Sequence, residues 1–291
     1  MKTMNKLITL LLAVFCGVAS AAPKNKSKPS AFEKDDPSAT KHIYKTVGGK
    51  SLALYVWQPE GHTADARVPG IVLFHGGGFR GGDYTQLIEQ AKYFASRGMV
   101  AVSVTYRLTS EPGVKVEDCI EDAKSAMRWV RANAAKLGID PDRLASGGGS
   151  AGGALAAATL LVDFANAKTD PKGVSAKPNA MVLFNPAFGS GRGEAGIHDR
   201  HDPEGKGDLR KYVKAGQPPC INFYGTEDDL LPDGRRFQEA YQKAGNRCEI
   251  ITYPGETHGF FNKPPYTKKT LAEADKFLVS IGWLKKKDEA R

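Results

Sequence analysis

Residues 148–152 read Gly-Gly-Ser-Ala-Gly and place one serine among glycines. They follow the short segment 143–146 and precede the alanine-rich run 154–158, which favours a helix. A serine at such a strand-to-helix turn forms a nucleophile elbow, because the flanking glycines leave room for a sharp backbone and the Ser150 hydroxyl projects above the sheet. The N-terminus of the following helix also favours developing negative charge. The segment therefore predicts a nucleophilic serine.

A second segment has the composition needed to bind the negative charge that a nucleophile creates on a carbonyl oxygen. Residues 75–79 read His-Gly-Gly-Gly-Phe and follow the apolar run 71–74. Three consecutive glycines leave backbone N–H groups unshielded, and acyl transfer needs such donors aimed at a tetrahedral oxyanion. A His-Gly-Gly-Gly turn after the third strand is the oxyanion loop of lipase- and esterase-like folds. Its position upstream of the serine disfavours an ordinary glycine turn.

Two further segments supply an acid and a base. Residues 225–232 follow the apolar run 221–224, and either Asp228 or Asp229 there can orient a histidine and stabilise its cationic form. Capping the next helix is the alternative role for either carboxylate. Among six histidines, only His258 follows the last apolar run on a tight loop, which makes it the candidate general base. The chain order serine, acid, histidine is the order of α/β-hydrolases.

The glycine-rich turns also match the dinucleotide fingerprint Gly-x-Gly-x-x-Gly, at residues 147–152 and 76–81. That fingerprint needs an acidic residue at the end of the next strand, about 20 residues further on. The candidates Asp163 and Asp170 fall at a helix end and in a loop instead. We therefore expect no nucleotide, and serine-based acyl transfer requires neither a metal nor an organic cofactor.

The rest of the pattern describes the scaffold that must position these segments. Apolar runs typical of strands buried on both faces alternate with amphipathic segments, and two further runs suggest an antiparallel pair with a turn at Gly48-Gly49. The predicted strands are 42–46, 52–58, 71–74, 100–105, 143–146, 181–185, 221–224 and 249–253, and the predicted helices are 116–137, 234–244 and 271–281. This alternation predicts an α/β fold with a mostly parallel eight-stranded sheet. Ligand sites of such sheets lie at the carboxyl ends of the strands, where all four segments fall.

The composition agrees with one large folded domain. The 291 residues are 41% hydrophobic and 25% charged, which excludes a disordered or coiled-coil chain. The net charge of +9 comes mostly from lysines in the two ends, so it favours solubility over nucleic-acid binding. We expect a disordered linker at 22–41, a catalytic domain at 42–284 and a basic tail at 285–291.

The N-terminus has the pattern of a signal peptide. Lys2 and Lys6 precede an apolar stretch over residues 7–18, and residues 19–21 read Ala-Ser-Ala. We expect cleavage after Ala21 and export to the periplasm or out of the cell. The stretch is too short to span a bilayer, so we expect no stable membrane anchor.

Two features leave alternatives open. Residues 188–217 form a polar insertion, expected to be a small lid, in which His198 and His201 lie near acids without a third ligand in register. We expect a solvated loop there, and a candidate contact for a polar or sugar-bearing substrate, rather than a metal site.

Cys220 and Cys248 stand at the start of two consecutive predicted strands. The sequence allows either a disulfide between them or two buried thiols.

In combination, residues 42–284 resemble an α/β-hydrolase of the acetyl esterase/lipase group related to hormone-sensitive lipase, without its helical cap. The resemblance rests on motifs at residues 75–79, 106–108, 138–143, 148–152, 225–232 and 258–260, in that order. It implies Ser150 as nucleophile, His258 as base and, through the pattern Gly-Thr-x-Asp-x-x-x-Pro, Asp228 as the partner of His258. One position departs from the family, since Gly149 stands where an acidic residue is common.

The resemblance also assigns the groups around the substrate. The implied oxyanion donors are the N–H groups of Gly76, Gly77 and Ala151, and the implied substrate contacts are His75, Gly78 and Phe79. The expected activity is carboxylesterase hydrolysis of short-chain acyl esters, with O-acetyl groups of carbohydrates as candidate substrates. The expected partner is a small-molecule or oligosaccharide ester. A secreted serine peptidase and a non-catalytic binding protein of the same fold are the alternatives.

Overall fold

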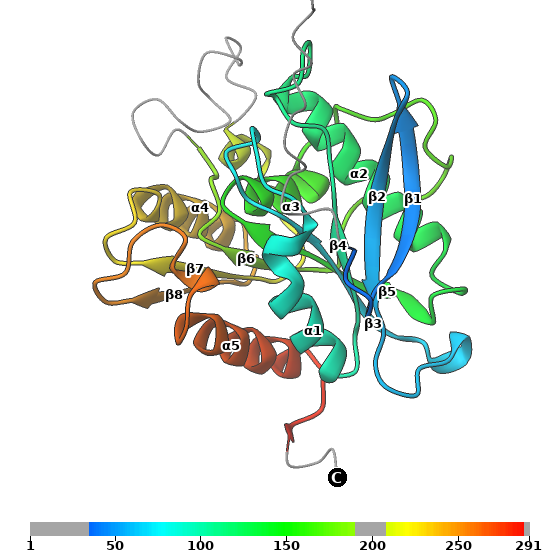
Figure 1. Ribbon diagram of the computed structural model, residues 1–291. Helices are drawn as coiled ribbons and strands as arrows, with labels where there is room; N and C mark the ends of the chain where they lie inside the picture. The colour runs from blue at the N-terminus through cyan, green and yellow to red at the C-terminus, as the bar shows by residue number, and fades with distance from the viewer. Residues whose placement is uncertain (1–34, 190–207, 288–291) are drawn as a thin grey trace, which may run out of the picture. The chain divides into compact units, whose positions relative to one another are not determined.

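The structure is a computed structural model that describes residues 35–189 and 208–287 (Figure 1). The predicted signal peptide, His198 and His201 lie outside these ranges. Within them no group of three potential metal ligands occurs. Across the same residues, no helix has the length and apolarity needed to cross a membrane.

The described residues form one eight-stranded sheet in the order β1-β2-β4-β3-β5-β6-β7-β8. The strands are β1 (Thr40–Val47), β2 (Lys50–Trp57), β3 (Val68–Phe74), β4 (Val100–Val104), β5 (Ile139–Gly149), β6 (Ala180–Phe184), β7 (Cys220–Gly225) and β8 (Cys248–Tyr253). The β1–β2 and β2–β4 pairs are antiparallel, and the other pairs are parallel. The predicted α/β class and the eight-stranded, mostly parallel sheet are confirmed.

Helices cover both faces of the sheet. They are α1 (Ile88–Ser96), α2 (Val116–Ala132), α3 (Ala151–Leu161), α4 (Leu231–Lys243) and α5 (Tyr266–Ser280). Apolar side chains of α2, α3 and α4 share one core cluster, and those of α1 and α5 share the other. Successive strand residues alternate between the clusters, as Val72 and Leu73 do. The strands are therefore apolar on both faces, which explains their continuous apolar runs.

Several predicted boundaries were wrong, since β5 already begins at Ile139 and α5 at Tyr266. The helix predicted over 116–137 ends at Ala132, where the backbone N–H and the side-chain amide of Asn133 both donate to the Trp129 carbonyl and cap the helix. The predicted linker 22–41 overlaps the folded unit, since β1 begins at Thr40. Before it, the Asp36 backbone N–H donates to the Tyr84 hydroxyl at 3.1 Å. Polar residues read as linker therefore hydrogen-bond to aromatic side chains of the fold.

A buried ion-pair network fixes the end of β4, beside the oxyanion loop. Arg107 Nε donates to Asp122 at 2.7 Å, and Lys45 Nζ on β1 donates to the same carboxylate at 2.7 Å. The Asp122 side chain is fully buried, so removing either cation would leave a buried charge partly unpaired. The network thereby holds Tyr106, which directly precedes Arg107.

Cys220 and Cys248 occupy paired positions on β7 and β8. Both are buried free thiols in the structure, and the Asn222 side-chain amide donates to Cys248 Sγ at 3.3 Å. This corresponds to the buried-thiol alternative.

Candidate active site

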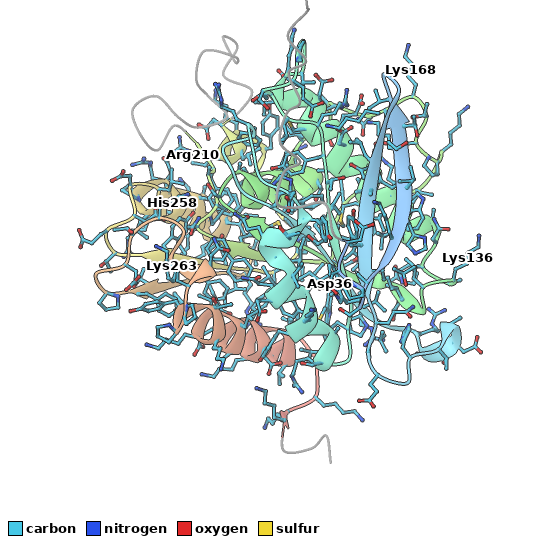
Figure 2. All side chains as sticks on the ribbon, in the orientation of Figure 1. Asp36, Lys136, Lys168, Arg210, His258 and Lys263 are labelled. Carbon is cyan, nitrogen blue, oxygen red and sulfur yellow. The ribbon has the colours of Figure 1, made fainter. Side chains whose placement is uncertain are left out.

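Three side chains from the carboxyl ends of three strands form one hydrogen-bonded chain. His258 Nε2 lies 2.8 Å from Ser150 Oγ, and His258 Nδ1 lies 3.0 and 3.1 Å from the two carboxylate oxygens of Asp228. Ser150 follows β5, Asp228 follows β7 and His258 follows β8. Figure 2 labels His258 in the loop after β8. The Asp228 side chain is fully buried, whereas 27% of the His258 side chain is exposed. The chain thus runs from the interior to a position that solvent and substrate can reach.

The backbone at Ser150 is strained in the manner of a nucleophile elbow. Ser150 has φ 53° and ψ −119°, a left-handed φ that is uncommon for residues other than glycine. Its N–H donates to the Phe184 carbonyl at 2.9 Å, and its carbonyl accepts from Ala187 N–H at 3.3 Å. A Cβ at Gly152 would overlap the carbonyl of Phe74. The turn is therefore held by the next strand and requires glycine on its helical side.

The structure also explains why glycine occupies position 149, where the family commonly has an acidic residue. A Cβ at this position would overlap the ring of Phe261, which lies shortly after His258 in the chain. Phe261 is 1% exposed and stacks on Phe184 with ring centroids 5.0 Å apart. The elbow packs here against an aromatic ring, which leaves no space for the acidic side chain common at this position.

The acid-bearing loop identifies which of the two neighbouring aspartates contacts the histidine. Asp228 is buried against His258, and its Oδ1 also accepts from Leu230 N–H at 2.9 Å, whereas Asp229 is exposed. The Glu227 N–H donates to the Glu256 carbonyl at 3.0 Å, which ties the acid loop to the histidine loop. These bonds hold the carboxylate within hydrogen-bond distance of His258 Nδ1.

Asn185 is a positioning residue that motif analysis did not identify. Its Oδ1 accepts from Gly259 N–H at 3.1 Å, so it holds the residue after His258. Asn185 is buried and has φ 37°, another strained position at the end of a strand. The sequence signal available for Asn185 was its position at the carboxyl end of a predicted strand.

The structure corrects the oxyanion loop at its first glycine. Gly76 is buried, and its N–H donates to Gln86 Oε1 at 2.6 Å. This N–H is therefore not free to bind an oxyanion. Gly77 is exposed, and Ala151 is the first residue of α3, where N–H groups lack intrahelical acceptors. Gln86 lies in a short 3-10 helix (Tyr84–Leu87) and carries no local sequence signal for this role.

Two predicted substrate contacts face the interior instead. His75 is 1% exposed, stacks on Tyr106 with centroids 4.2 Å apart, and donates from Nδ1 to the Gly76 carbonyl at 2.8 Å. Phe79 belongs to a core cluster. The assignments of His75 and Phe79 to substrate are therefore wrong in this structure, because both pack beneath the loop. Gly78 is exposed and stays a predicted contact.

Burial of His75 predicts a pH-dependent stability. Burial lowers the pKa of His75 from 6.5 to about 4, so the unfolded chain binds more protons between these values and stability falls as the pH drops. From about pH 7 to about pH 5 this group alone should cost roughly 2 kcal/mol. Urea unfolding of the wild type and of His75→Asn measures the effect. The variant should lose less stability over this range, and identical pH dependence in both proteins would contradict the prediction.

Comparisons with known proteins agree with this geometry. The profile of the α/β hydrolase fold matches residues 71–208, and that of the dienelactone hydrolase family matches residues 206–287. Carboxylesterase NlhH of Mycobacterium tuberculosis is 30% identical over 67% of both chains. Esterase LipI of the same organism is 30% identical over 74% of this chain and 73% of its own.

Solved structures extend the similarity to nearly the whole fold. Thermogutta terrifontis esterase 2 matches with a TM-score of 0.83 and 42% identity, over 88% of this chain and 99% of that chain. Structures of that esterase include forms described as propionate bound, butyrate bound and phosphorylated by paraoxon. The eight-stranded sheet, the family profiles and these esterases lead to one conclusion: the chain belongs to the α/β-hydrolase esterase family and is a carboxylesterase.

Proposed function

We propose that the protein hydrolyses short-chain carboxylic esters through an acyl-enzyme on Ser150, with His258 as general base and Asp228 as its partner. The observation that carries the proposal is the continuous chain of contacts between the three side chains, at 2.8 and 3.0 Å. Such a chain activates a serine hydroxyl that is otherwise a weak nucleophile.

The proposed reaction has two balanced steps. His258 Nε2 takes the Ser150 proton as Oγ bonds to the ester carbonyl carbon, and the oxyanion accepts hydrogen bonds from the N–H groups of Gly77 and Ala151. His258 then returns the proton to the leaving alcohol as its C–O bond breaks. His258 next takes a proton from water as the water oxygen bonds to the acyl carbon, and returns it to Ser150 Oγ as the C–Oγ bond breaks and the acid leaves. Asp228 stays ionised and stabilises the imidazolium.

The related esterase supports a small acyl group, because its structures are described with propionate and butyrate. Rates with p-nitrophenyl acetate, butyrate, octanoate and laurate test the proposal. We expect kcat/KM to be highest for acetate or butyrate, and a maximum at laurate would overturn the short-chain assignment. Turnover of peptides without turnover of these esters would favour the peptidase alternative.

We also propose O-acetylated carbohydrates as natural substrates and export as the location. The signal-like residues 1–21 support export, which would bring the enzyme to extracellular carbohydrate. Acetate release from acetylated xylan tests the substrate. N-terminal sequencing of the exported protein tests the location, with Ala22 expected as the first residue and an intact Met1 contradicting cleavage.

Gln86 is expected to affect the rate through the oxyanion loop. Gln86→Met removes the acceptor of Gly76 N–H, so the neighbouring Gly77 donor should lose its fixed direction. We expect kcat for p-nitrophenyl acetate to fall about tenfold with little change in KM, because oxyanion bonds act mainly in the transition state. Gln86→Glu keeps an oxygen acceptor and should retain more activity. Equal, wild-type rates in both variants would contradict this role.

A further inference from the structure

A polar groove of about 310 Å³ lies beside the catalytic serine. It is lined by Gln86, Glu89, Gln90, Asn262 and Thr267. All five side chains carry hydrogen-bonding groups, and none is apolar or cationic. Gln86 and Glu89 are exposed, so the groove opens to solvent, whereas Gln90 at 1% exposure lies at its buried end.

Both walls of the groove contact the nucleophile elbow. On one wall, Gly76 lies between Gln86 and the serine. A Cβ placed on Gly76 would be 3.3 Å from Gln86 Oε1 and also 3.3 Å from Ser150 Cβ. On the other wall, Asn262 directly follows Phe261, whose ring packs against Gly149. Figure 2 labels His258 and Lys263, the residues shortly before and directly after this wall. A substrate held at Ser150 therefore has the groove at its side.

The groove offers both hydrogen-bond donors and hydrogen-bond acceptors to a ligand. Gln86 uses its Oε1 on Gly76, which leaves its amide N–H groups as donors. Gln90 Oε1 is buried, and no described residue donates to it. A buried acceptor without a donor is costly, and a ligand hydroxyl would satisfy it. The Glu89 carboxylate at the rim adds an acceptor and repels anionic groups.

We infer that this groove is a subsite for the hydroxylated alcohol part of the ester, a sugar or another neutral polyol. Hydroxyl groups both donate and accept, which matches the mixed lining. We assign the groove to the alcohol part of the ester because the leaving alcohol oxygen takes its proton from His258. The groove wall that contains Asn262 follows His258 in the same loop. The inference rests on the proposed esterase function and adds the residues that would contact the hydroxylated alcohol.

The experiment compares two acetate esters that differ in their hydroxyl groups. The substrates are a mono-O-acetyl methyl xyloside and cyclohexyl acetate, whose ring has the same size without hydroxyls. The measured quantity is the ratio of kcat/KM for the sugar ester to kcat/KM for cyclohexyl acetate. Gln90→Leu and Asn262→Ala should each lower this ratio about tenfold, the loss expected for one hydrogen bond of about 1.4 kcal/mol.

A matched control separates the groove from general effects of losing a glutamine. Gln58 is exposed directly after β2, which runs antiparallel to β4 and so ends at the opposite edge of the sheet. Gln58→Leu should keep the wild-type ratio. Thermal unfolding checks that Gln90→Leu is folded, and the exposed Asn262 gives a second variant that does not alter the core.

Each outcome decides between the two hypotheses. An unchanged ratio in both groove variants, or a wild type that cleaves cyclohexyl acetate but not the sugar ester, would overturn the subsite while leaving the esterase intact. A wild type that cleaves neither ester nor p-nitrophenyl acetate would overturn the proposed function itself. A reduced ratio in both variants supports the subsite.

Discussion

Replacing Ser150 by alanine is expected to lower kcat for p-nitrophenyl acetate by about 10⁶-fold, because the variant lacks the atom that forms the acyl-enzyme. The Ser150 backbone is already held by the Phe184 and Ala187 hydrogen bonds, so the variant should fold as the wild type does. Stopped and continuous assays, with protein concentrations taken from absorbance, measure the loss. Thermal unfolding serves as the control for folding.

The same prediction extends to His258, because the base and the nucleophile act as one unit. His258→Ala alone should cost about as much as Ser150→Ala, and the double variant should show little further loss. The 2.8 Å contact between Nε2 and Oγ is the physical basis of this coupling. Additive losses in the double variant would show that the two side chains act independently. A Ser150→Ala protein with most of its activity would contradict the nucleophile assignment.

Replacing Asp228 by asparagine is expected to lower kcat by about 10⁴-fold while leaving the fold intact. The carboxylate accepts from His258 Nδ1–H, and this bond keeps Nε2 unprotonated so that it can take the Ser150 proton. An asparagine amide facing Nδ1 would favour the opposite tautomer, in which Nε2 carries the proton and cannot act as a base.

The neighbouring aspartate supplies the matched control. Asp229→Asn makes the same chemical change one residue later, at an exposed side chain, and should leave kcat within about twofold, as expected of a surface change away from the reacting groups. Measuring kcat for both variants with p-nitrophenyl acetate tests the assignment. A larger loss in Asp229→Asn than in Asp228→Asn would reverse the assignment.

Local sequence patterns predicted the parts of this site that depend on neighbouring residues. Glycines beside Ser150 and an apolar run before each loop are local features, so the elbow and the parallel sheet could be predicted. The choice between Asp228 and Asp229 needed the family pattern, because both follow the same strand. The structure shows its basis, since Asp228 is buried against His258.

Contacts between distant segments could not be predicted in this way. Gly76 lost its expected role because Gln86, from the turn before α1, accepts its N–H. His75 was expected near substrate, yet its ring stacks on Tyr106 from the end of β4. The constraint on Gly149 comes from Phe261, more than a hundred residues later in the printed sequence. Each depends on three-dimensional packing that no short motif records.

Covalent labelling by paraoxon tests the central claim most directly. The related esterase 2 of Thermogutta terrifontis has a structure described as phosphorylated by this compound. The protein should gain the mass of a single diethylphosphoryl group, on the peptide that contains Ser150, and lose its esterase activity in proportion. Ser150→Ala should gain none. Labelling of another residue, or full activity after labelling of Ser150, would contradict the account.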